Sequence, residues 1–243
     1  MSGLPKFSYP TLTFNLPSTK QAFKFRPFLV KEEKILLLAK SSEDSTDILT
    51  AIKQVVNNCA LDINFNVNKI TIFDLEDLFL KIRAASIESI IKVSYRDADD
   101  KEIYDFEVDL DKVEVQFPKG EVADPKIKLT DDAGILLKYP AATLYDDKEF
   151  LHLGEDDENQ LMFELVARSI DQVYQGEKVY QAKDYKKAEL MEFIESLSIE
   201  VFEKIDAFLK NTPKMEHILT YKNKLGAEKK IVLSSLNDFF TLR

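Results

Sequence analysis

A cluster of aspartates in the middle of the chain is the nearest approach to a metal site in this sequence. Asp97, Asp99 and Asp100 resemble the opening of a calcium-binding EF-hand loop. Such a loop requires glycine at its sixth position, where the chain turns sharply, and a glutamate that closes it. Glu102 occupies the sixth position, and the closing glutamate is missing from its place. We therefore interpret these aspartates as a turn between two strands.

Other residues that could bind metal or act as nucleophiles are few. His152 and His217 lie far apart, and neither has a second histidine or cysteine three or four positions away. Cys59 is the only cysteine, so the chain can form neither an internal disulfide nor a thiolate metal cluster. It lies on the apolar face of a predicted helix, and we interpret it as a small buried side chain, not a reactive thiol.

The sequence carries no catalytic motif. Its six glycines form no glycine-rich phosphate loop, and no serine lies in a Gly-x-Ser-x-Gly elbow. Carboxylates are numerous enough for a hydrolase pair, and the acidic run 155–158 could hold a loose cation, but nothing in the sequence brings two of them together. We therefore predict a protein without enzymatic activity, cofactor or metal.

The charge balance disfavours nucleic acid as a direct partner. The chain has 43 acidic and 33 basic residues, which gives a net charge of −10. Proteins that bind nucleic acid usually present a basic face, because neutralising phosphates supplies most of the affinity. The longest apolar run, Ile35 to Ala39, is far shorter than the roughly 20 residues of a membrane span. We therefore expect a cytosolic protein, or part of a soluble assembly, with no membrane span.

The chain is organised around a stretch in which the hydrophobic period changes. Phe23 and Phe25 alternate with basic residues, as in a half-buried strand, and Pro27 then ends the pairing. From Val30 the period is helical, which predicts a helix over 31–39. Its expected apolar face includes Val30, Leu37 and Leu38, and its expected polar face includes Lys31, Glu32 and Lys40.

The pattern along the rest of the chain predicts an α+β fold in three parts. Residues 1–88 carry an N-terminal hairpin and three helices, and residues 89–142 form a small antiparallel β insertion. Residues 143–243 carry helices and a closing strand at 231–233, and pack on the N-terminal part. Within this last part we expect helices over 161–173, 190–209 with a new cap at Ser198, and 215–222.

Three segments of the chain, Phe25–Lys34, Asp74–Arg83 and Asn237–Phe240, resemble one family. It is the family of baseplate hub subunits and hub assembly proteins of T4-like contractile-tailed phages, and the resemblance covers nearly the whole chain. Many relatives carry a cysteine-paired, zinc-ribbon-like hairpin in the middle segment. The corresponding residues here, 93–102, contain no cysteine, so zinc is not expected.

The resemblance implies a non-enzymatic tail protein that builds or forms part of the baseplate central hub through protein–protein contacts. Its partners would be other hub proteins, with the tape-measure protein as a further candidate, and its location the virion or the host cytoplasm during assembly. One alternative is a transient chaperone that is absent from the mature virion, since the strand-to-helix opening also looks like that of some tail assembly chaperones. A second is a cell-wall hydrolase of the hub, suggested only by the carboxylates.

Candidate residues for partner binding or for structure lie at the strand-to-helix corner and in the tail. They are Arg26, Pro27, Phe28, Asp238, Phe239 and Phe240. The three phenylalanines either anchor partners, as aromatic residues often do, or close the protein's own core. Arg26 is expected to form a buried, charge-assisted pair with a carboxylate of another segment, for example Asp238.

Overall fold

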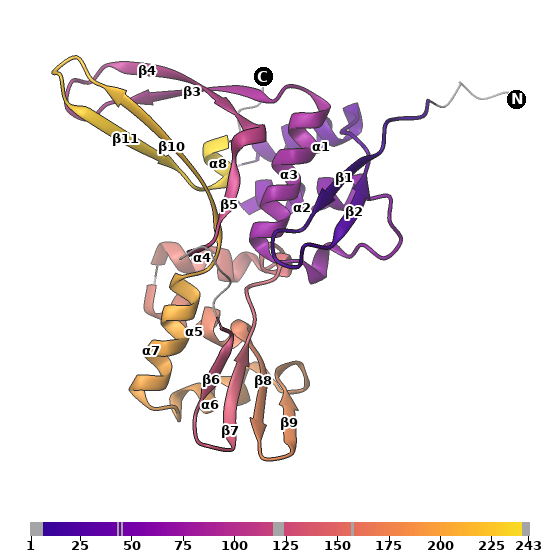
Figure 1. Cartoon of the computed structure of the whole chain (residues 1–243), viewed down its shortest axis with the longest axis vertical. Helices are drawn as coiled ribbons and strands as arrows, with labels where there is room; N and C mark the ends of the chain where they lie inside the picture. The colour runs from indigo at the N-terminus through magenta and orange to yellow at the C-terminus, as the bar shows by residue number, and fades with distance from the viewer. Residues whose placement is uncertain (1–6, 43, 45, 119–123, 157, 240–243) are drawn as a thin grey trace, which may run out of the picture. The chain divides into compact units, whose positions relative to one another are not determined.

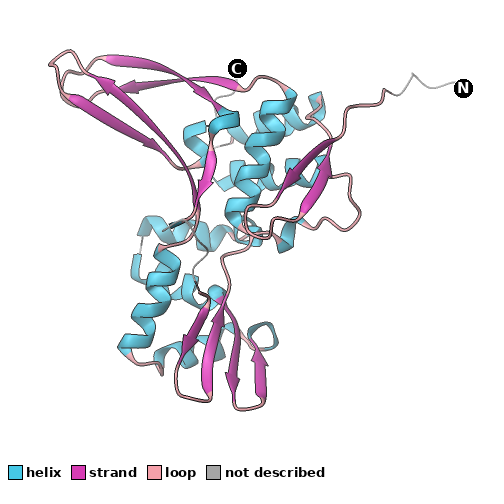
Figure 2. Cartoon of the chain, in the orientation of Figure 1, coloured by secondary structure: helices cyan, strands magenta, loops and turns pink. Residues whose placement is uncertain are grey.

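The computed structural model describes residues 7–42, 44, 46–118, 124–156 and 158–239 (Figure 1). Helices and strands are both abundant, which confirms a mixed α+β composition (Figure 2). The chain divides into two compact units. Unit 1 contains Met1–Val115 and Lys214–Arg243, and unit 2 contains Gln116–Pro213.

Unit 1 begins with the predicted hairpin, followed by three helices. Strands β1 (Leu12–Asn15) and β2 (Ala22–Phe25) pair antiparallel, with Leu12 opposite Phe25. The helices that follow are α1 (Val30–Lys40), α2 (Thr46–Cys59) and α3 (Ile72–Ser86), with a short 3-10 turn, η1 (Val67–Lys69), before α3.

Helix α3 starts with the capping box that the sequence predicts. The Thr71 hydroxyl accepts a hydrogen bond from the Asp74 backbone N–H, and the Asp74 carboxylate accepts one from the Thr71 N–H. The same carboxylate also binds the backbone N–H and hydroxyl of Ser18, in the turn between β1 and β2. One buried aspartate therefore caps α3 and fixes the hairpin to it.

The core of unit 1 is rich in phenylalanine, as expected from a chain with seventeen Phe and no Trp. Phe25, Phe73, Phe79 and Phe239 are fully buried, and the Phe25 ring lies 5.2 Å from that of Phe65 in an edge-on contact. Cys59 is also fully buried, as predicted.

The predicted apolar face of α1 is wrong. Val30 and Leu38 are 81% and 64% exposed, whereas Glu32 and Leu36 are buried. The helix is rotated from the expected orientation because Glu32 faces Arg26 on the preceding corner. A charge pair thus sets which face of α1 packs inward.

Two hairpins of unit 1 come from distant parts of the chain. The first contains β3 (Ile90–Arg96) and β4 (Ile103–Asp109), and is followed by η2 (Leu110–Lys112) and β5 (Glu114–Gln116). The second contains β10 (Lys214–Lys222) and β11 (Glu228–Leu233), with β5 beside β10, and precedes the short helix α8 (Leu236–Phe239).

The helix expected over 215–222 is therefore wrong, because these residues form β10. The apolar spacing of Met215, Ile218 and Leu219 fits one helical face, but the inward side chains alternate with period two once the strand pairs with β11. Gly226, expected just past a helix end, instead lies in the hairpin turn with φ +84°. The closing strand at 231–233 is confirmed within β11.

Unit 2 is built on one antiparallel sheet with strand order β6-β7-β8-β9. The strands are β6 (Lys126–Lys128), β7 (Ala133–Leu137), β8 (Ile170–Gln175) and β9 (Lys178–Gln181). Its helical segments are η4 (Ala142–Asp146), α4 (Lys148–Asp156), α5 (Glu158–Ser169), η5 (Ala182–Asp184), α6 (Lys187–Glu195) and α7 (Ile199–Lys210).

The helix expected over 161–173 ends earlier than predicted. Ile170 and Val173 belong to β8, where they pair with Leu137 and Ile135 of β7. The predicted cap at Ser198 is confirmed, since its hydroxyl accepts a hydrogen bond from the Val201 N–H. The core of unit 2 lies between the sheet and the helices around Ile135, Val166, Ile170, Ile194, Ile205 and Phe208.

Strands from the region 89–142 are distributed over three sheets. β3 and β4 pair with each other, β5 lies beside β10, and β6 and β7 join β8 and β9. The pairs β3–β4 and β6–β7 are antiparallel. However, β5 lies beside β10 and β7 pairs with β8, and both of these partners come from later in the sequence.

Candidate functional site

The strand-to-helix corner holds a bidentate ion pair. Arg26 Nη2 lies 2.9 Å from Glu32 Oε1, and Arg26 Nη1 lies 3.0 Å from Glu32 Oε2. The guanidinium also donates to the carbonyl oxygens of Pro27 at 2.9 Å and Asn58 at 2.8 Å. Arg26 thus joins β2, α1 and the end of α2 through one planar fork.

The carboxylate that binds Arg26 is therefore Glu32, and the expected pair with Asp238 is wrong. Burial of Glu32 alone would raise its pKa, but hydrogen bonds from Arg26 and from the Leu29 N–H outweigh burial and lower it. The neighbouring Cys59 thiol has its pKa raised to about 12, chiefly by burial. Cys59 therefore stays a neutral thiol at physiological pH and is not a nucleophile.

Phe28 and Phe239 both close the core against α3. Phe28 packs with its ring 5.8 Å from that of Phe79, and its N–H donates to Ser86 Oγ at 2.7 Å. Phe239 is fully buried, and its carbonyl accepts a hydrogen bond from Arg83 at 3.0 Å. The second half of α3 therefore brings the corner and the tail together.

The remaining predicted site residues have local roles or lie outside the described residues. Pro27 is partly exposed and contributes the carbonyl that Arg26 binds. The Asp238 carboxylate accepts hydrogen bonds from the N–H groups of Ser234 and Ser235, at the start of α8. Phe240 lies outside the described part of the chain. A partner-binding role for the corner and tail stays a prediction.

A second feature of unit 1 is an arm formed by the β3–β4 and β10–β11 hairpins (Figure 1). The inward face of each hairpin carries aromatic and apolar side chains. The Tyr221 ring, from β10, lies 4.7 Å from the Tyr104 ring and 5.5 Å from the Phe106 ring, both from β4, and 6.3 Å from the Tyr95 ring of β3. A lone two-stranded hairpin is marginally stable in water, so this aromatic contact supports both hairpins.

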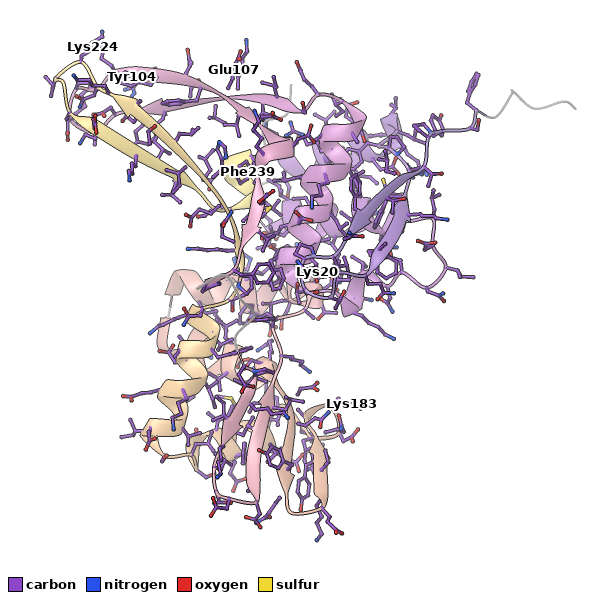
Figure 3. The ribbon with its side chains drawn as sticks, viewed as in Figure 1. Lys20, Tyr104, Glu107, Lys183, Lys224 and Phe239 are labelled. Atoms are coloured by element: carbon purple, nitrogen blue, oxygen red, sulfur yellow. The ribbon has the colours of Figure 1, made fainter. Side chains whose placement is uncertain are left out.

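The tips of the two hairpins are joined by the aspartates that resembled a calcium loop. Tyr221 Oη donates to Asp97 Oδ2 at 2.5 Å, and Lys229 Nζ lies 2.5 Å from Asp99 Oδ2. The Lys224 N–H donates to Asp100 Oδ2 at 2.9 Å and to Tyr104 Oη at 2.8 Å. Figure 3 shows Tyr104 and Lys224 close together at this end of the arm.

The predicted turn at 97–100 is thus confirmed, and its carboxylates bind protein groups. The hydrogen bond from Tyr221 is the main reason that the pKa of Asp97 falls to about 2, helped by the N–H groups of Asp99 and Asp100. Asp97 is therefore ionised at physiological pH and holds two segments that are 124 residues apart.

Apolar side chains also point outward from the arm. Ile218 and Val232 lie directly opposite each other on β10 and β11 and are 49% and 50% exposed. Thr220 and Lys230 form the next outward pair, because the pairs on one face recur every second residue. We call these four residues the outer strip. Paired exposed Ile and Val side chains are suited to burial against another protein.

Sequence reasoning does not find the arm, because the spacing of Met215, Ile218 and Leu219 predicts a helix where the structure has β10. The available signal was the alternation of Met215, His217, Leu219 and Tyr221, followed by a glycine and a second alternating run. No local sequence pattern predicts that Asp97 and Tyr221 lie close together, because they are 124 residues apart.

The described residues do not suggest a catalytic or metal centre. Among them, no group of three or more His, Cys, Asp and Glu is placed to hold a metal ion. In the same part of the chain, no helix has the length and apolarity needed to cross a membrane.

Comparison with known protein families gives a match over most of the chain. A family model described as "T4 bacteriophage base plate protein" matches residues 9–241, which include both units and the whole arm. No curated protein and no solved structure matches the chain. Since the match covers nearly the entire sequence, the chain belongs to the T4 bacteriophage base plate protein family and is a structural protein of the phage tail baseplate.

Proposed function

We propose that this baseplate protein builds the central hub, and that it does so by docking the outer strip of its arm onto another hub protein. The observation that carries the proposal is the arm itself. Two hairpins distant in sequence are joined by an aromatic cluster, by the Tyr221–Asp97 hydrogen bond and by the Lys229–Asp99 ion pair at their tips. These contacts hold the two hairpins together, and the Ile218 and Val232 side chains on the outward face are about half exposed.

The composition of the outer strip fits a protein partner. Ile218 and Val232 provide apolar area at its centre, and Thr220 and Lys230 provide a polar margin. Protein interfaces commonly have such an apolar centre and polar rim. The partner we infer is a hub protein that presents a complementary apolar patch.

The proposal is tested by producing the protein together with the other hub proteins of the same phage and separating the mixture by size-exclusion chromatography. We expect co-elution with at least one hub protein. A persistent lone species with every partner would contradict the proposal.

Mass spectrometry of purified mature virions distinguishes a retained subunit from a transient assembly factor. The proposal as a hub subunit predicts that peptides of this chain are present at a fixed ratio to other baseplate proteins. Their absence from virions, combined with a complex before assembly, would favour the chaperone alternative.

A further inference from the structure

Unit 2 contains a pocket of about 600 Å³ on the face of its sheet near α6. Its walls come from β7, β8, β9, η5 and α6, so it is built from segments between residues 129 and 193. The side chains that define its chemistry are two tyrosines, one phenylalanine and two glutamates: Tyr180, Tyr185, Phe193, Glu189 and Glu192. No part of the arm or of the corner described above contributes to it.

A glycine on β7 fixes the face of the sheet on which the Tyr174 side chain lies. Gly134 lies directly opposite Tyr174 of β8. A Cβ atom at residue 134 would lie 2.3 Å from Tyr174 Oη and 2.6 Å from the Ile127 carbonyl oxygen. The Tyr174 side chain therefore lies across the glycine, on the face of the sheet opposite to that of its neighbour Val173, which lines the pocket.

The two carboxylates are placed by helix α6. Glu189 is the third residue of α6, and its Oε2 accepts a hydrogen bond from the Lys186 N–H at 2.9 Å in a capping box. Glu192 follows three positions later on the same helical face. The capping bond fixes Glu189 at the pocket, and no Lys, Arg or His is among the residues that line the pocket.

We propose that this pocket binds an arginine side chain presented by an exposed segment of another baseplate protein. A guanidinium is attracted to the faces of aromatic rings, and it donates hydrogen bonds to carboxylates, so both kinds of lining residue suit it. Leu129, Val173 and Leu190 provide apolar surface for the aliphatic part of the side chain. An anionic group would meet two glutamates and no cationic side chain among the lining residues.

Arginine fits the lining better than lysine. The guanidinium is planar and weakly hydrated, and it can stack on a tyrosine ring while donating to a carboxylate. The lysine ammonium is compact and strongly hydrated, so moving it into an aromatic pocket costs more. We therefore expect the order arginine, then lysine, then neutral side chains.

The site is tested on the full-length protein by NMR titration with the acetylated and amidated tripeptide Ala-Arg-Ala. We expect saturable shifts confined to backbone amides of β8, β9 and α6. The same tripeptide with citrulline in place of arginine, which keeps the shape and removes the charge, should bind at least about fivefold more weakly. Equal binding of the two peptides, or shifts that never saturate, would overturn the proposal.

Glu189→Gln combined with Glu192→Gln should abolish the preference for arginine over citrulline. Glutamine at residue 189 can still accept the capping hydrogen bond, so the helix is retained. The matched control is Glu203→Gln, on the exposed face of α7, which should keep the full preference. An unchanged preference in the double variant would contradict the assignment.

The identity of the partner as a baseplate protein rests on the proposed function, whereas the peptide titration does not. Arginine binding by the isolated protein together with failure to join any hub complex would reject the hub proposal and keep the pocket. Formation of hub complexes by a protein that shows no preference for arginine would reject the pocket proposal and keep the hub proposal.

Discussion

At the scale of single residues, the contact between Arg26 and Glu32 determines how the first helix packs. Glu32 is a fully buried carboxylate with two bonds to Arg26 and one to the Leu29 N–H. A buried pair of this kind need not add stability relative to apolar residues of the same size, but it strongly disfavours any arrangement that leaves one partner alone. The pair therefore specifies the rotation of α1.

Replacement of Arg26 by alanine is expected to destabilise unit 1 by about 3–5 kcal/mol, because the buried Glu32 would keep only the exposed Lys31 ammonium, at 3.6 Å, as a counter-charge. Urea unfolding followed by circular dichroism measures the change. The double variant Arg26→Met with Glu32→Leu should recover most of the loss.

The matched control is Lys92→Ala, which removes an exposed ion pair to Glu107 at 3.9 Å and should cost less than about 1 kcal/mol. A loss for Arg26→Ala no larger than that of the control would show that the pair does not determine the packing.

Acid should remove the contribution of Glu32. Its pKa in the folded protein lies below the ordinary value of 4.5, so the unfolded chain binds more protons as the pH falls. The contribution is fully present above about pH 4.5 and is lost as the pH falls through the lower folded value.

Wild-type protein and Glu32→Gln should therefore differ most in free energy of unfolding near neutral pH and converge as the pH falls through the lowered folded pKa of Glu32. Urea titrations at several pH values check this. A difference that stays constant across the range would contradict the role assigned to the carboxylate.

At the scale of elements, the arm depends on contacts that join two hairpins distant in sequence. Tyr221 contributes both a ring to the aromatic cluster and a hydroxyl to Asp97. These two contributions can be separated, because phenylalanine keeps the ring and loses the hydroxyl.

Tyr221→Phe should loosen the tip of the arm and leave the helices of unit 1 unchanged. We expect the amides of Asp97 and Lys224 to exchange with deuterium faster, on the order of tenfold. Hydrogen–deuterium exchange with mass spectrometry measures this.

Glu107→Gln, on the outward face of β4 (Figure 3), is the matched control and should leave exchange at the tip unchanged. Equal protection in Tyr221→Phe and wild type would mean that the hydroxyl does not hold the hairpins together.

Gly134→Ala should destabilise unit 2 by about 1–3 kcal/mol, since a methyl group there overlaps Tyr174 and a backbone carbonyl that cannot move aside easily. Calorimetry measures this loss of stability. Gly176→Ala is the control, because residue 176 has φ +57° and open space around it, so only the backbone conformation is penalised, by about 1–2 kcal/mol. An unchanged stability of unit 2 in Gly134→Ala would contradict the close approach of Tyr174 to residue 134.

Local sequence patterns predicted the elements whose determinants are local. The β1–β2 hairpin, α2 and the capped start of α3 follow from alternation, an apolar stripe and a Thr-x-x-Asp box. The end of α5 was missed because no glycine or proline separates Ser169 from Ile170, and pairing with β7 converts the remainder into a strand.

The candidate sites depend on contacts that no local pattern reports. Glu32 is buried because the chain turns at the corner and brings it against Arg26. Hydrophobic periodicity does not report such a contact, so it predicted that Glu32 lies on the solvent-exposed face of the helix. The approach of Asp97 to Tyr221 joins residues that share no motif. The resemblance to the baseplate family rested on residues 25–34, 74–83 and 237–240, and the family match confirms a T4 phage baseplate protein.

At the scale of the whole molecule, the protein is a baseplate component with two units that carry different candidate contacts. Unit 1 presents the outer strip of the arm, and unit 2 presents the aromatic pocket. Separate sites on separate units would let one chain hold two neighbours, which suits a protein that builds an assembly.

The central claim, docking through the outer strip, is tested most directly by size-exclusion chromatography after co-production with the hub proteins of the phage. The variant Ile218→Asp with Val232→Asp charges the centre of the strip, and Ile199→Asp charges a side chain that is 80% exposed on unit 2. We predict that wild type and Ile199→Asp co-elute with a hub partner, and that the double variant, folded by circular dichroism, elutes alone. Co-elution of the double variant at wild-type yield would contradict the account.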